Sequence, residues 1–128
     1  MEFLKLAAIA FLVFLVIDAV WLIFISRKLY DRELKEIKKE KISWPAAVIF
    51  YVIYIIGITF FVIQPAVEKE SVLYAMGAGA LFGLVAYATY DLTNLATMKG
   101  FPLKITIIDL IWGTFVTAAV AVLTYIIV

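Results

Sequence analysis

The sequence predicts an all-α integral membrane protein, a four-helix transmembrane bundle, from its composition and from four long apolar stretches. Of its 128 residues, 66% are hydrophobic, and the mean hydropathy is +1.11. Soluble domains are about 45–50% apolar, and a fold of this size could not hide so much apolar surface from water. We therefore expect a single domain over residues 1–128 that crosses a plasma or inner membrane several times, with the lipid bilayer as its surroundings.

Each apolar stretch is close to the length of about 20 residues that a helix needs to cross a hydrocarbon core of about 30 Å. The stretches cover residues 6–26, 44–63, 72–90 and 105–128. The first is too long for the apolar part of a signal peptide, about 7–15 residues, and no small-residue cleavage site precedes Arg27, so we expect a retained helix. The second begins after Ser43, a suitable N-cap, with Pro45 in its first turn.

Proline and glycine mark the breaks between the later stretches. Residues 64–71 contain Pro65 and are expected to form a turn, because proline is poorly tolerated inside a helix. Residues 91–104 contain Gly100 and Pro102 and are expected to connect the third helix to the fourth.

The distribution of lysine and arginine predicts the orientation of the chain. The first and third loops together carry nine of these residues, against only Lys5 and Lys69 on the other side. The positive-inside rule then places both loops in the cytoplasm and both termini outside, an N-out/C-out arrangement. Within the first loop, Tyr30, Leu34 and Ile37 recur at helical spacing, which predicts a short amphipathic cytoplasmic helix between helices one and two. A solvated connector is the alternative.

Each expected helix carries one stripe of small or polar residues at helical spacing, and these stripes should face one another. The stripes are Phe14, Asp18, Trp21 and Ile25; Tyr54, Gly57, Phe61 and Gln64; Gly79, Gly83, Tyr87, Asp91 and Asn94; and Thr106, Asp109, Gly113, Thr117 and Ala121. The predicted packing positions are Gly57, Gly79, Gly83 and Gly113, because glycine lets two helix backbones approach closely in lipid.

Three aspartates within or at the end of these helices are the main candidates for function. Asp18 lies nine residues before Arg27, about 13 Å along a helix, and Asp109 lies five residues after Lys104, about 7–8 Å along. Asp91 ends the apolar part of the third helix. A carboxylate at the centre of a membrane helix costs at least about 2.5–3.5 kcal/mol, so each needs a partner or a purpose.

Two interpretations of the aspartates stay open. They form a cytoplasm-facing site that binds a cation, a proton or a lipid headgroup, or they serve as hydrogen-bonding links between helices. For the first interpretation, the candidate site consists of Asp18, Tyr87, Asp91, Thr93, Asn94, Thr106, Asp109 and Trp112.

The pattern Ile-Asp-x-x-Trp occurs twice, with its aspartates at Asp18 and Asp109 and its tryptophans at Trp21 and Trp112. The two helices run in opposite directions, so we expect the tryptophans to point to different depths. The match is then a coincidence rather than a repeat.

The chain has no histidine and no cysteine, which removes the usual neutral-pH base, the thiolate nucleophile and the disulfide. We expect no cofactor, and whether a metal ion binds stays open. A net charge of +1, with basic residues interleaved with acidic ones, argues against nucleic acid as a partner.

Several runs of residues resemble an uncharacterised family of prokaryotic membrane proteins, domain-of-unknown-function family 2177. They are residues 90–97 (YDLTNLAT), residues 101–104 (FPLK), Asp109-x-x-Trp112-Gly113-Thr114, Asp18-x-x-Trp21 and Trp44-Pro45. The resemblance covers nearly the whole chain and implies a four-helix membrane protein without an established activity. It also implies that the family's site includes Asp91, Thr93, Asn94, Asp109 and Trp112.

Three functions are compatible with this sequence. Polarity concentrated on inward faces favours a small transporter or an ion- or proton-binding protein, which would form a homo-oligomer because four helices rarely enclose a whole pathway. The first alternative is an accessory or scaffold subunit of a membrane assembly, in which the aspartates serve folding. The second is a membrane enzyme that acts on lipid. The sequence argues against it, because it has no histidine and no recognisable nucleophile or phosphate-binding motif.

Overall fold

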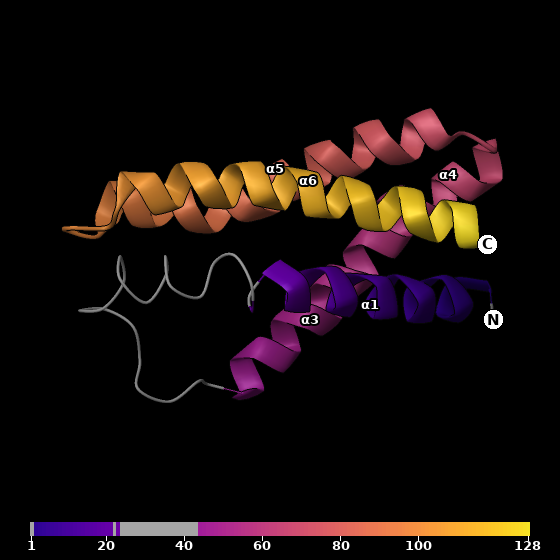
Figure 1. Cartoon of the computed structure of the whole chain (residues 1–128), viewed down its shortest axis with the longest axis horizontal. Coiled ribbons are helices and arrows are strands. Elements are labelled where there is room, and N and C mark those ends of the chain that lie inside the picture. Colours follow the sequence, from indigo (N-terminus) through magenta and orange to yellow (C-terminus); the bar gives the residue numbers. More distant parts are fainter. Residues whose placement is uncertain (1, 22, 24–43) are drawn as a thin grey trace.

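The computed structural model describes residues 2–21, 23 and 44–128, and this part of the chain is all-helical (Figure 1). The elements are α1 (Glu2–Val20), α3 (Trp44–Ile58), η2 (Thr59–Ile63), α4 (Gln64–Lys69), α5 (Val72–Thr97) and α6 (Leu103–Ile127). Four of the described helical segments are long and apolar enough to cross a membrane: Glu2–Val20, Pro45–Lys69, Val72–Thr97 and Leu103–Ile127. The predicted four-helix transmembrane bundle is thereby confirmed. The expected amphipathic helix around Leu34 lies outside the described residues.

Successive spans run in opposite directions (Figure 1). Both termini therefore lie at one end of the molecule, and the connection between α5 and α6 lies at the other end, beyond the level at which α1 ends and α3 begins. Asp18 lies two residues before the end of α1, Asp91 lies six residues before the end of α5, and Asp109 lies six residues after the start of α6. Which end faces the cytoplasm stays a prediction.

The second span continues through Pro65, where the sequence predicted a turn over residues 64–71. It passes from α3 through the π-helical η2 into α4, and only Glu70 and Ser71 separate it from α5. Proline lacks the N–H that would bond the carbonyl four residues earlier, that of Phe61. The hydroxyl of Tyr74 donates to this carbonyl instead, at 3.4 Å. The wider π-turn and this external donor let the helix accommodate the proline.

The third span is also longer than predicted, because α5 continues seven residues beyond Tyr90 to Thr97. Residues 91–97 were expected to begin a connection, because their polar side chains end the apolar stretch. The helical hydrogen bonds of the backbone do not depend on that polarity, and they continue through these residues. The actual connection is residues 98–102, where Gly100 adopts a left-handed φ of 82° that glycine accommodates without a Cβ clash.

The closest helix pair is α5 and α6, which lie side by side along most of their length (Figure 1). A Cβ placed on Gly83 would overlap the carbonyl oxygen of Gly113 and lie 2.7 Å from the Cβ of Thr117. A Cβ on Gly113 would overlap the ring of Tyr87. Only hydrogen atoms fit at these two positions, so the glycines set the separation of the two helices.

The expected stripes lie mainly in the interior, with Phe61 as an exception. Phe14, Tyr54 and Thr117 are buried, whereas Phe61 is 60% exposed. The buried positions of the second span form two adjacent lines at intervals of four, and Phe61 lies on neither. The lines are Tyr54, Ile58, Val62 and Ala66, and Ile55, Thr59 and Ile63.

Candidate functional site

Four helices contribute to one polar pocket of about 490 Å³, which we call the aromatic–carboxylate pocket. It is lined by Asp18, Trp21, Tyr51, Tyr87, Tyr90, Asp109 and Trp112. Asp18 comes from α1, Tyr51 from α3, and Tyr87 and Asp109 from α5 and α6. Of the eight residues in the sequence-based candidate site, the pocket brings together Asp18, Tyr87, Asp109 and Trp112.

Asp18 is linked to the second span by a hydrogen bond. The hydroxyl of Tyr51 donates to Oδ2 of Asp18 at 3.3 Å, which is long for an O–H···O bond. An ionised carboxylate offers about four acceptor positions, and Tyr51 uses one of them. The ring of Phe14 packs against Tyr51 with centroids 5.6 Å apart, which holds the phenol beside Asp18. Asp18 therefore retains acceptor capacity within a structurally supported site.

A second polar contact links the second span to α6. Tyr54 and Thr117 are both buried, and their side-chain oxygens lie 2.6 Å apart in a hydrogen bond between α3 and α6. Tyr54 is one helical turn from Tyr51 and packs on Phe14 at 5.0 Å. This bond ties the second span to the α5–α6 pair directly beside the pocket.

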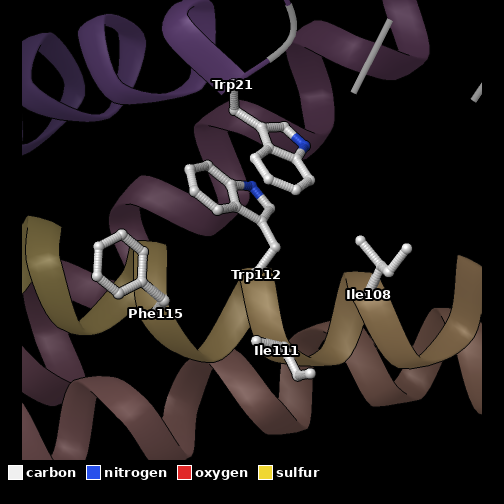
Figure 2. Close-up of a pocket in the computed structure, with 5 residues that line it drawn as sticks. All are labelled: Trp21, Ile108, Ile111, Trp112 and Phe115. Atoms are coloured by element: carbon white, nitrogen blue, oxygen red, sulfur yellow. The ribbon is translucent and has the colours of Figure 1, made fainter. Parts of the chain in front are cut away.

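Trp21 and Trp112 stack on each other across the gap between α1 and α6. Their ring centroids are 4.2 Å apart and their planes are inclined by 10°, and Figure 2 shows the two indoles meeting from opposite helices. The expectation that they point to different depths was wrong. Measured from the end of the molecule that holds the α5–α6 connection, Asp18 lies deeper than Asp109. Because α1 runs toward that end and α6 runs away from it, Trp21 lies nearer to it than Asp18 does, and Trp112 lies farther from it than Asp109 does. The two rings therefore meet at the same level. The two aspartates are then offset by about 9 Å along the bundle axis.

The tryptophan pair also borders a second, apolar pocket of about 370 Å³ (Figure 2). Its remaining lining residues are Ile108, Ile111 and Phe115, all from α6. The two pockets therefore share Trp21 and Trp112 as lining residues.

Asp91 does not line the aromatic–carboxylate pocket. Its side chain is 0% exposed, and among the described residues neither carboxylate oxygen has a hydrogen-bond partner. Thr106 is buried as well, but its hydroxyl donates to the carbonyl of Pro102 at 3.2 Å. Thr93 is exposed and Asn94 is partly exposed on the last turns of α5. These four members of the sequence-based site therefore lie apart from the pocket that holds the other two aspartates.

Sequence reasoning did not select Tyr51, Trp21 or Tyr90 as site residues. Tyr51 lies three residues before Tyr54, which was placed on an inward stripe, so helical spacing could have found it. Trp21 could have been selected because Asp18-x-x-Trp21 repeats the pattern that contains the selected residues Asp109 and Trp112.

The pocket combines two carboxylates with three phenols and two indoles. Within the part of the chain that the structure describes, no group of three or more acidic side chains is placed to hold a metal ion. A carboxylate beside aromatic faces is instead suited to holding a single positive charge, because ring quadrupoles attract cations.

A family model described as "Predicted membrane protein (DUF2177)" matches residues 3–126 of the chain. No curated protein and no solved structure matches the chain significantly.

Proposed function

This chain belongs to the DUF2177 family of predicted membrane proteins, and we propose that it binds a cation or a proton in the aromatic–carboxylate pocket, as a small transporter or ion-binding protein. The observation that carries this proposal is the convergence of Asp18 and Asp109, from the first and last spans, on one pocket. Carboxylates inside membrane spans are costly and are usually tied to ion pathways or proton relays.

The surroundings of Asp18 support a binding role over a purely structural one. A residue that serves only to link helices would be expected to satisfy its hydrogen-bonding capacity within the protein. Among the described residues, Asp18 instead accepts one long hydrogen bond, from Tyr51, and it borders a pocket of about 490 Å³. That space admits a ligand and its water, and Tyr51, Tyr87 and Tyr90 supply neutral hydroxyl groups around it.

Thermal unfolding of the purified protein in a non-ionic detergent tests the proposal. Sodium, potassium and ammonium salts and a pH series would be compared for the wild type, Asp18→Asn and Asp109→Asn, with Asp91→Asn as the matched control outside the pocket. A ligand that binds only the folded state stabilises it by about 2.7 kcal/mol at a hundredfold excess over its dissociation constant. We expect at least one cation or pH step to stabilise the wild type and Asp91→Asn, but not the two pocket variants.

The opposite result has a clear meaning. If no condition stabilises the wild type selectively and the pocket variants only unfold earlier in every condition, Asp18 and Asp109 are structural links. The role of a scaffold subunit would then replace the binding role.

A further inference from the structure

We propose that the ligand of the aromatic–carboxylate pocket is a lipophilic monocation, an alkylated ammonium head that carries an apolar or aromatic tail. This inference rests on the proposed function and specifies its ligand class. It draws on three features: the aromatic walls of the pocket, its size, and the apolar pocket that borders the same tryptophan pair.

The walls of the pocket favour an organic cation over a small inorganic one. Five of its lining residues are aromatic, and only two are carboxylates. Sodium and potassium ions replace lost hydration with several oxygen ligands held close together, but Asp18 and Asp109 are offset by about 9 Å along the bundle axis. An alkylated ammonium, in contrast, is attracted by the faces of tryptophan and tyrosine rings. Asp18 supplies negative charge beside these rings, and within the described part of the chain its one bond, to Tyr51, leaves capacity to face a cationic head.

The size of the pocket also favours an organic cation over a small inorganic one. Its volume of about 490 Å³ falls within the range of about 300–1,000 Å³ that is typical of sites for organic ligands. A bare metal ion would occupy a small part of this space.

The second pocket accounts for the tail. It shares Trp21 and Trp112 with the polar pocket, and its other walls are aliphatic or aromatic (Figure 2). Ile111 and Phe115 are 66% and 59% exposed on a membrane-spanning helix, so this pocket opens toward the acyl chains of the bilayer. A ligand with its charged head beside Asp18 can extend its tail past the indole pair onto this surface, and it can enter from the lipid.

Calorimetric titration of the full chain in non-ionic micelles tests the inference with a matched set of probes. The first probe is 3-phenylpropyl-trimethylammonium, the second is its neutral carbon isostere (4,4-dimethylpentyl)benzene, and the third is tetramethylammonium, which has no tail. Empty micelles correct for partitioning of the probes. We expect saturable binding of the first probe, at least about tenfold tighter than that of the third, which corresponds to about 1.4 kcal/mol. The neutral isostere should show no saturable binding.

Single-residue variants test which side chains bind the cationic head of the ligand and which bind its tail. Asp18→Asn should weaken both cationic probes, and Phe115→Ala should weaken only the probe with a tail. Phe60→Ala is the matched control, because Phe60 is similarly exposed, at 56%, and lines neither pocket. If Asp18→Asn fails to fold, competition between the probes on the wild type decides the question without a variant.

The outcomes separate the inference from the proposed function. Saturable binding of sodium or potassium, without binding of the ammonium probes, overturns the inference and leaves the proposed function standing. Equal affinity for the probes with and without a tail also overturns it. If neither an ammonium probe, an inorganic cation nor a pH step acts on the pocket, both proposals fail.

Discussion

Replacing Gly83 by alanine is expected to force apart the two most closely packed helices of the bundle. The new Cβ would overlap the carbonyl oxygen of Gly113 and lie 2.6 Å from Oγ1 and 2.7 Å from Cβ of Thr117. Ordinary van der Waals contact begins at 3.4 Å, so α5 and α6 must separate by at least about 0.7 Å at this level. That movement also strains the bond between Thr117 and Tyr54, which is 2.6 Å long.

The cost can be isolated with Gly77→Ala on the same helix. Nothing lies within 4 Å of a Cβ at Gly77, so that variant gains only the helix propensity of alanine, up to about 1 kcal/mol. Gly83→Ala gains the same amount and loses about 1–3 kcal/mol to overpacking. The difference between the two variants therefore measures packing alone and should be about 1–3 kcal/mol.

The assay is reversible unfolding in mixed micelles, followed by far-UV circular dichroism as the denaturing detergent fraction is raised. Gly79→Ala provides a graded intermediate, because its nearest contact would be 3.0 Å, from the Cα of Ala118. The expected order of stability is Gly77→Ala, then Gly79→Ala, then Gly83→Ala. Equal stability of the first and last variants would refute the close approach of α5 and α6.

Three further predictions concern side-chain contacts. Tyr54→Phe and Thr117→Ala should show a coupling of about 0.6–1.7 kcal/mol in a double-mutant cycle, because both end the same interhelical bond; additive effects would contradict it. Trp21→Ala and Trp112→Ala should couple by about 0.5–1.5 kcal/mol through ring stacking, and independent losses would argue against the stacked pair. Asp91→Asn should be at least as stable as the wild type in thermal unfolding, because the described residues offer its buried carboxylate no hydrogen bond; a marked loss of stability would contradict this.

The architecture was predictable because membrane insertion imposes strong constraints on sequence. Apolar length alone defines the spans, and the breaks at Gly100 and Pro102 locate the final connection. The ends of the helices were less predictable, because hydropathy follows contact with lipid rather than backbone hydrogen bonding. The last turns of α5 are polar yet helical, and Pro65 is accommodated through the carbonyl of Phe61 and the hydroxyl of Tyr74.

The candidate site was only partly predictable, for a geometric reason. Aspartates within apolar spans are conspicuous, and Asp18 and Asp109 line the same pocket. Which aspartates share a pocket depends on how far each helix is shifted and rotated, and the sequence does not specify that. Asp91 lies apart from the pocket for this reason, whereas Tyr51, three residues before Tyr54 on the second span, lines the pocket although sequence reasoning had not selected it.

Carboxyl ¹³C NMR of protein labelled only at aspartate tests the central claim most directly. The chain has four aspartates, so few signals need assignment, and single Asp→Asn variants assign them. Titration with 3-phenylpropyl-trimethylammonium, or with whichever inorganic cation stabilises the protein, should move the Asp18 and Asp109 signals together along one saturation curve. Asp91 should stay unchanged as an internal reference. A shift of Asp91 alone, or no saturable shift at Asp18 and Asp109, would contradict a shared cation site in the aromatic–carboxylate pocket.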